Sequence, residues 1–256
     1  MLKAFFIFIL FIASQLLSGF IAVMLGNWEN IRNDQPIEWL LGAGISPTSL
    51  ALSMILASAL LFILLWLLRL TSNHPLASIL FRRSKKDWRL LGAFILVGVG
   101  LTFLLHPFDL DDGGLTDLIR QGKNNVLMML MICVVGPIIE EVVFRDGIQR
   151  QLSAIGLKPW LAILTTSVSF GIVHGNFAQA LPAIVLGVLL GWLYYKTGDL
   201  RLCVPAHIFN NSLAALSLHI PELEIYMEAW PTLLFYVMGS GVVALGGWLF
   251  YRHYSK

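Results

Sequence analysis

The chain has 256 residues, of which 57% are hydrophobic and only 12% are charged, and its mean hydropathy is +0.79. A soluble domain is usually ~25% charged, so this chain has too few polar groups to cover a soluble globule. The hydrophobic content also excludes intrinsic disorder, and a net charge of +2 is too small to indicate a nucleic-acid partner. The composition instead predicts a polytopic helical membrane protein.

Eight apolar segments follow one another along the chain and predict about eight membrane-spanning helices. The segments are Ala4–Leu25, Pro47–Leu70, Leu90–Leu105, a fourth that starts near Val126, Pro159–Val173, Ala178–Tyr195, Leu200–Leu218 and Trp230–Tyr251. The first is longer than the roughly 7–15-residue apolar region of a signal peptide and has no small-x-small cleavage site, so we expect a retained span. No internal repeat or long linker divides the chain, which predicts a single membrane domain over residues 1–256.

Basic residues predict the orientation of these spans. With a cytoplasmic N-terminus, 14 of the 17 Lys and Arg residues fall on the cytoplasmic side, and only Arg32, Arg120 and Lys123 fall outside. Ten of the 15 acidic residues fall outside. Because loops rich in Lys and Arg stay in the cytoplasm, both termini are predicted to be cytoplasmic. The sequence therefore predicts an all-α, multi-pass protein of a plasma (inner) membrane, with a prokaryotic membrane favoured over the endoplasmic reticulum.

The fourth span carries two carboxylates, and ionisable residues within spans normally mark function because they are costly in lipid. Glu141 and Arg145 are four residues apart and are predicted to pair on one helix face. Glu140 lies ~100° round the helix, without such a partner in its own helix, and is a candidate general base. Pro137 frees the Cys133 carbonyl and predicts a kink. The alternative is a pair of structural carboxylates near the cytoplasmic interface.

Two more polar groups interrupt later spans. His174 ends the fifth span, four residues after Phe170. His207 and Asn211 are also four residues apart, so they share one face of the seventh span and predict the lining of a cavity. A surface histidine at 174 and a packing histidine at 207 are the alternatives. With the carboxylates, these side chains supply a base, two imidazoles and an amide donor, as hydrolysis requires; neither His-Glu-x-x-His nor Gly-x-Ser-x-Gly occurs.

The order of these residues resembles the motifs of the CAAX-protease and bacteriocin-processing family (CPBP, or Abi) of intramembrane endopeptidases, which is related to the eukaryotic prenyl-protein endopeptidase. The family motifs Glu-Glu-x-x-x-Arg, Phe-x-x-x-His and His-x-x-x-Asn match Glu140-Glu141…Arg145, Phe170…His174 and His207…Asn211. The resemblance covers roughly residues 125–215. Asp146 departs from the pattern, since family members often carry Gly directly after the Arg, and this affects only the expected local packing.

The resemblance implies an intramembrane endopeptidase that hydrolyses membrane-associated peptides or proteins. It implies that Glu140 activates the attacking water with the help of His174. It further implies that His207 and Asn211 stabilise the oxyanion. Family members are commonly described as metalloproteases, and Glu140, His174 and His207 are competent zinc ligands. The sequence requires no cofactor, however, and a metal-free, glutamate-driven mechanism is slightly favoured.

By the same resemblance, Glu141 and Arg145 hold the site together. Two other classes of function remain open: a non-catalytic immunity or chaperone-like protein on the same scaffold, and a small proton-coupled transporter, although the inverted repeats of many transporters are absent. Counted along their spans, Glu140, His174 and His207 reach the same depth in the membrane only under two conditions. The fourth span must project into the cytoplasm, and the fifth must stop short of the outer face. We therefore expect a water-filled cavity that opens to the cytoplasm.

Overall fold

The computed structural model describes residues 1–28, 32, 45–72, 85–108, 114–198, 200–220, 222, 227 and 229–254. All the secondary structure in these residues is helical, which confirms the predicted all-α fold class. The elements are α1 (Leu2–Gly26), α4 (Pro47–Leu67), α6 (Lys85–Leu105), α7 (Leu115–Gln121), α8 (Val126–Leu130), η1 (Met131–Val135), α9 (Gly136–Glu141), η2 (Val142–Gln149), α10 (Arg150–Ala154), α11 (Pro159–Ile172), α12 (Phe177–Thr197), α13 (Cys203–Ser217) and α15 (Thr232–Tyr254). Some loop charges used above for orientation, among them Arg82, Arg83, Asp111 and Asp112, lie outside the described residues.

Six helical segments in the described part of the chain are long and apolar enough to cross a membrane: Leu2–Gly26, Pro47–Leu67, Trp88–Leu105, Val126–Ala154, Phe177–Thr197 and Thr232–Arg252. The two remaining predicted spans are α11 and α13, which have 14 and 15 residues. At ~1.5 Å per residue they are shorter than the ~30 Å apolar core of a bilayer. The chain is thus a multi-pass membrane protein, but only six of the eight predicted spans are long enough to cross alone.

Local sequence signals explain where these helices begin and end. Ser46 and Asn176 accept backbone N–H groups at the starts of α4 and α12, and Pro47 and Pro159 occupy first-turn positions where a missing N–H does no harm. Gly198 ends α12 in the left-handed region, with φ of 71°. Such caps satisfy backbone groups that lipid cannot.

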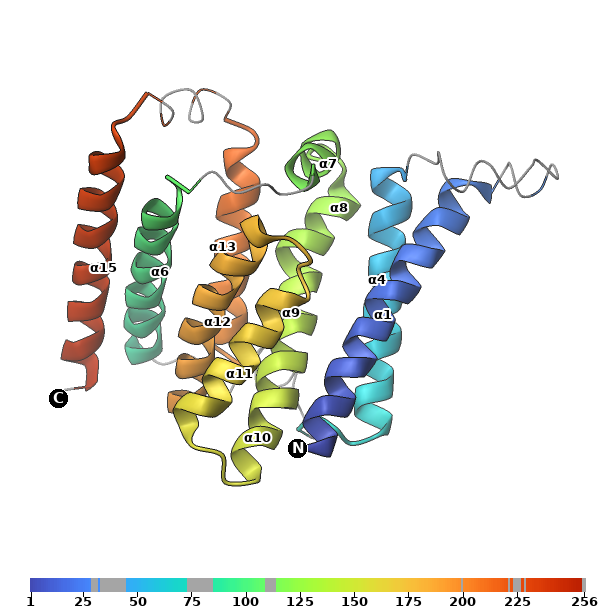
Figure 1. Cartoon of the computed structure of the whole chain (residues 1–256), viewed down its shortest axis with the longest axis horizontal. Coiled ribbons are helices and arrows are strands. Elements are labelled where there is room, and N and C mark those ends of the chain that lie inside the picture. Colours follow the sequence, from blue (N-terminus) through green and yellow to red (C-terminus); the bar gives the residue numbers. More distant parts are fainter. Residues whose placement is uncertain are drawn as a thin grey trace.

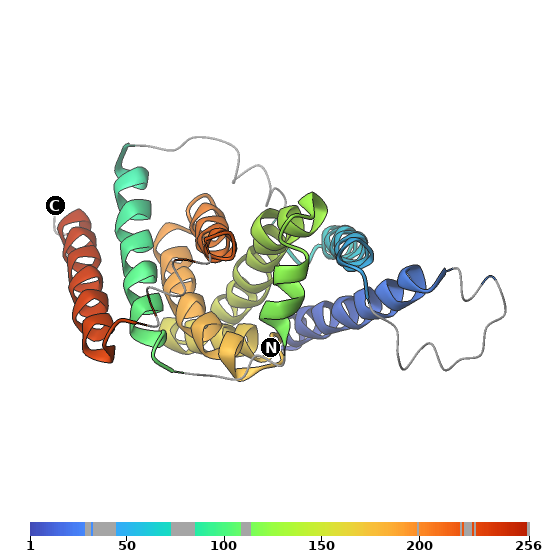
Figure 2. The same ribbon diagram turned by 90° about the horizontal axis from the view of Figure 1, so that it is seen from above.

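The helices form a row of three groups (Figures 1 and 2). The pair α1 and α4 lies on one flank, the pair α6 and α15 lies on the other, and the long helix from α8 to α10 packs with α11, α12 and α13 between them. Helix α1 packs against α4 through small side chains. A hydrogen bond between Ser18 Oγ and Ser53 Oγ, which are 3.2 Å apart, joins the two helices. Both ends of the chain lie at the same end of the bundle, opposite α7 (Figure 1).

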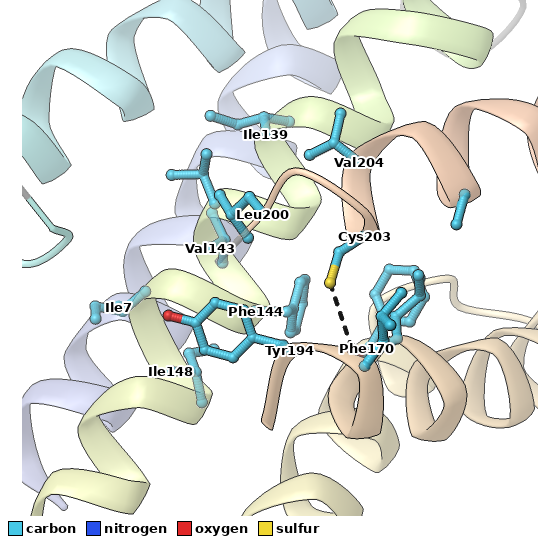
Figure 3. Packing of buried hydrophobic residues seen from close by; sticks show 14 of the residues in the cluster. Ile7, Ile139, Val143, Phe144, Ile148, Phe170, Tyr194, Leu200, Cys203 and Val204 are labelled. Carbon is cyan, nitrogen blue, oxygen red and sulfur yellow. Dashed lines mark hydrogen bonds between the residues drawn. The ribbon is translucent and has the colours of Figure 1, made fainter. Parts of the chain in front are cut away.

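The middle of the long helix is the centre of the core. All eight residues of η2 are buried, which is unusual for a membrane helix and reflects its packing among α1, α10, α11 and α12. Phe144 meets the rings of Phe11 and Phe170 edge-on at 5.2 and 5.1 Å. Figure 3 shows Phe144 and Phe170 of this cluster together with Cys203, whose Sγ lies 3.6 Å from the Leu190 carbonyl oxygen. The candidate site lies directly beside this rigid packing.

Two π-helical segments, η1 and η2, flank the two glutamates of α9. In η1 the Gly136 N–H reaches back five residues to the Met131 carbonyl. In that register the next N–H would reach Ile132, but position 137 is proline and has none. Pro137 therefore leaves the Ile132 carbonyl, and not the predicted Cys133 carbonyl, without a backbone partner. In a π-helical turn the N–H bonds the carbonyl five residues back and not four, so the affected carbonyl is one residue earlier.

Glycines allow α6 and α15 to approach closely. A Cβ atom on Gly100 would stand 2.8 Å from the Gly239 carbonyl oxygen, and one on Gly246 would stand 2.8 Å from the Ala93 carbonyl oxygen. Both contacts are with rigid backbone, so neither helix can give way locally. Only glycine fits these crossing points.

Replacement of Gly100 by Ala should therefore push α6 and α15 apart and lower the free energy of unfolding by about 1–3 kcal/mol, as overpacking does. The matched control is Gly98→Ala on the same helix, where a Cβ would meet nothing within 4 Å. It should be neutral or stabilising by up to about 1 kcal/mol, since Ala favours helix. Thermal unfolding in detergent measures both, and equal melting temperatures would contradict the packing described here.

Candidate active site

The His207 ring lies between the two glutamates of α9. Its Nδ1 is 3.0 Å from Glu141 Oε1, and its Nε2 is 3.5 Å from Glu140 Oε2. His207 is 2% exposed, whereas the Glu140 side chain is 22% exposed. Helix α13 thus supplies the partner of Glu140 that its own helix does not, a tertiary contact that spacing along the sequence could not reveal.

Behind this row lies a fully buried ion pair. Glu141 Oε2 is 3.0 Å from Arg145 Nε, and both side chains are 0% exposed, which confirms the predicted pairing. The N–H is poorly aligned for a hydrogen bond, and no acceptor in the described part of the chain bonds Nη1 or Nη2. The guanidinium instead faces the Phe170 ring, 5.5 Å from its centroid. Attraction between opposite charges in a dry core therefore holds the pair, more than directed hydrogen bonding does.

Asn211 is the second functional side chain of α13. Its Nδ2 donates to the Ile132 carbonyl over 3.1 Å, the same carbonyl that Pro137 leaves without a backbone N–H. Asn211 therefore fastens α13 to the wide turn before the glutamates. Asn211 also lines the cavity described below.

His174 lies in the turn between α11 and α12. Its Nδ1 is 2.8 Å from the Phe170 carbonyl. A carbonyl can only accept, so Nδ1 carries the hydrogen and Nε2 of the neutral ring is an acceptor. The Phe170 ring stands edge-on between the two histidines, with its centroid 4.9 Å from that of His174 and 5.7 Å from that of His207. The Phe170 motif residue thus spaces the two imidazoles.

A cavity of about 320 Å³ brings three of the four predicted catalytic residues together: Glu140, His174 and Asn211 all line it. His207 lies behind Glu140 and is not part of the lining. The remaining wall is mostly apolar, with Gln15, Ser58 and Gln179 as its other polar residues. These three residues were not predicted from the sequence. Gln15 could have been noticed, because it is a polar side chain, exposed in the structure, in the middle of the apolar helix α1.

Most of the cavity lining lies in one half of the bundle. On the long helix it is lined only by residues of the first half, from Met128 to Glu140, and on α4 only by residues from Leu50 to Ser58. It reaches α7, at the end of the bundle away from the termini (Figure 1). Most of the lining therefore lies in the half of the bundle away from the termini, and the cytoplasmic opening expected from the sequence stays a prediction.

The three predicted zinc ligands do not converge. In the described ranges no group of three or more His, Cys, Asp and Glu side chains is placed to hold a metal ion. His207 presents both ring nitrogens to carboxylates, and it lies outside the cavity that His174 lines. A catalytic zinc needs three protein ligands and one open position. In this arrangement Glu140, His174 and His207 do not fit such a centre.

Asp146, the departure from the family pattern, is buried in a polar cluster of its own. Its Oδ2 accepts the Ser72 N–H over 2.7 Å, and its Oδ1 lies 3.3 Å from both Tyr194 Oη and Arg150 Nε. The carboxylate thus links the end of α4 to η2, α10 and α12. It contacts none of the predicted catalytic residues.

Loss of the Arg145 charge should leave Glu141 buried without its cation, so Arg145→Met should lower the free energy of unfolding by about 3–5 kcal/mol. The Glu141→Gln, Arg145→Met double variant should lose less than Arg145→Met alone. Arg120→Met, at an exposed ion pair with Asp117, is the control and should lose less than about 1 kcal/mol. Denaturant unfolding in detergent measures these free energies. A double variant that is less stable than Arg145→Met would contradict the prediction.

Comparisons with known proteins agree with the site motifs. The family model described as "Type II CAAX prenyl endopeptidase Rce1-like" matches residues 122–213, which hold every predicted site residue. The chain is 29% identical over 116 residues to "Putative membrane peptidase YdiL" of Bacillus subtilis (strain 168), across 44% of this chain and 46% of that protein. The match thus spans less than half of that relative, and no solved structure matches the chain. Residues 122–213 of the chain are therefore similar to the CAAX endopeptidases.

Proposed function

We propose that the chain is an intramembrane endopeptidase in which Glu140 activates water against a peptide bond. The observation that carries this proposal is that Glu140, His174 and Asn211 line one cavity from three separate segments of the chain. A general base must face the space where substrate and water meet, and Glu140 is the partly exposed carboxylate of the pair. The family match at residues 122–213 supports the same class of reaction.

The proposed reaction begins when a water molecule beside Glu140 gives its proton to the carboxylate and its oxygen attacks the peptide carbonyl carbon. The resulting oxyanion accepts a hydrogen bond from the side-chain amide of Asn211. Glu140 then returns the proton to the leaving nitrogen, and the carbon–nitrogen bond breaks. His174 Nε2, an acceptor at the cavity wall, orients the water.

His207 takes a different role from the one that the resemblance implies. Both of its nitrogens face carboxylates, so it has no free N–H for an oxyanion. Instead its Nδ1 contacts Glu141 and its Nε2 faces Glu140, which holds the Glu140 side chain in place beside the cavity. The buried Glu141–Arg145 pair fixes the ring from behind. We therefore propose His207 as a positioning residue.

Glu140→Gln should reduce the hydrolysis rate by roughly 10²–10⁴-fold, because the amide cannot accept the proton of the attacking water. The measurement is the release of peptide fragments, by mass spectrometry, from bacterial membranes that contain the active or the variant protein. Asp117→Asn, which removes an exposed carboxylate on α7, is the matched control and should change nothing.

Full activity of both Glu140→Gln and His174→Ala, at normal expression, would overturn the proposal. It would favour the non-catalytic immunity or chaperone-like protein. Proton-coupled uptake that depends on Glu140, without any fragment release, would instead favour the transporter.

Activity should survive removal of metal ions. The purified protein, dialysed against a strong chelator, should contain well under one zinc per chain and should cleave at the rate of the untreated sample, since the proposed steps use only side chains of the chain itself. Loss of activity that added zinc restores would contradict the metal-free mechanism. It would leave the peptidase proposal intact.

A further inference from the structure

Gln15 is a polar side chain at the middle of a mostly apolar membrane helix. Helix α1 covers Leu2–Gly26, and position 15 is next to its midpoint. The Gln15 side chain is exposed, and it makes no hydrogen bond among the residues that the structure describes. Because an amide finds no water at the centre of a bilayer, a glutamine there needs a polar partner or a hydrated space. The cavity beside Glu140 provides that space, since Gln15 lines it.

The packing of α1 against the long helix fixes which turns of the two helices lie side by side. The two helices run in opposite directions (Figure 1). Ile7 lies against Gly147, where an added Cβ would stand 3.3 Å from Ile7 Cγ2. One turn further along each helix, the Phe11 ring meets the Phe144 ring edge-on at 5.2 Å. The contacts therefore advance by one turn on both helices together.

The next turn of each helix carries this register into the cavity. Four residues lead from Phe11 to Gln15, and four lead back from Phe144 to Glu140. Residues four apart lie about one turn apart on the same face of a helix. Phe11, Gln15 and Glu140 all line the cavity. Gln15 on the α1 wall therefore lies at the depth of Glu140 on the wall that the long helix forms.

A peptide bond that is hydrolysed at this depth creates a need for hydrogen-bond partners. The segment around the cleaved bond has to leave the helical conformation, so its N–H and C=O groups lose their partners in neighbouring turns. Each unpaired group costs free energy comparable to a lost hydrogen bond. A glutamine amide carries a donor and an acceptor side by side, which complements the C=O and N–H of a peptide backbone. Gln15 therefore has the chemistry that an extended substrate backbone requires.

The other two side-chain amides of the cavity already use an atom within the chain. Asn211 Nδ2 donates to the Ile132 carbonyl over 3.1 Å. Gln179 Oε1 accepts from Asn176 Nδ2 over 3.3 Å. Gln15 is thus the cavity amide whose donor and acceptor are both free among the described residues.

We propose that Gln15 binds the backbone of the substrate polypeptide, with its amide hydrogen-bonded to a peptide group beside the bond that Glu140 hydrolyses. This inference rests on the proposed function. It adds a substrate-binding residue that lies outside residues 122–213, the part of the chain that the family model matches. Because the peptide group that Gln15 holds is not the one that reacts, the contact stabilises the bound substrate and the transition state equally.

Binding tests the proposal without requiring any hydrolysis. The probe is a fluorescently labelled synthetic peptide of Leu and Ala residues, titrated against the purified full chain in detergent, with Glu140→Gln as the background. Adding Gln15→Met, which keeps an unbranched side chain and removes the amide, should weaken binding roughly 5–30-fold. Leu16→Met is the matched control and should leave the affinity unchanged, because Leu16 is the exposed neighbour of Gln15 and does not line the cavity.

Three results of the titration would overturn the proposal. They are equal affinity with and without Gln15→Met, an equal loss of affinity in Leu16→Met, and the absence of saturable binding to the background chain. Thermal unfolding of the same samples should give equal melting temperatures. A loss of affinity that comes with a lower melting temperature would assign Gln15 a structural role and would also overturn the proposal.

Hydrolysis gives the second measurement. In the chain that keeps Glu140, Gln15→Met should raise KM for the same peptide by the factor found in the titration and leave kcat unchanged, as loss of uniform binding does. A lower kcat with unchanged KM would overturn the proposal. Hydrolysis that depends on Glu140 but not on Gln15 would remove this inference and leave the peptidase proposal standing. Peptide binding that depends on Gln15, in a chain that cleaves nothing, would remove the peptidase proposal and leave Gln15 as a peptide-binding residue.

Discussion

The arrangement of the site depends on a buried polar row, in which Arg145, Glu141 and His207 lie in contact at the centre of the bundle. Arg145 or Glu141 alone would be a strongly destabilising buried charge, so each of the two requires the other. The row also joins two helices far apart in sequence, because Glu141 lies on α9 and His207 on α13. Only Glu140, at the end of the row, reaches the cavity. The buried charges thus position a single carboxylate that can do chemistry.

The wide helical turns on either side of the glutamates have a related effect. Proline at 137 would normally leave an unpaired carbonyl in the core, and here Asn211 satisfies it. The same side chain is therefore bound to the irregular backbone and presented to the cavity. Irregular backbone inside a membrane protein is tolerated where neighbouring side chains complete its hydrogen bonds, as happens here.

Sequence patterns predicted the contacts that lie within one helix but missed most of those between helices. The Glu141–Arg145 pair follows from four-residue spacing and is present. The contact between His207 and Glu140 could not be predicted, since it depends on how α13 packs against α9. Hydropathy located all eight apolar segments, but it could not show that α11 and α13 are shorter than a span. The side of the membrane to which the cavity opens stays a prediction, because depth along separate spans carries no information about where a cavity opens.

The shortness of α11 and α13 has a consequence for the lipid around them. Helices of 14 and 15 residues match a bilayer thinner than average, so the surrounding acyl chains must compress or tilt to cover them. Such a dent brings bulk water closer to mid-depth beside these two helices. It also creates a hydrophobic mismatch that favours neighbouring chains with short apolar stretches, so lipid thickness itself becomes a filter on what can lie beside the cavity.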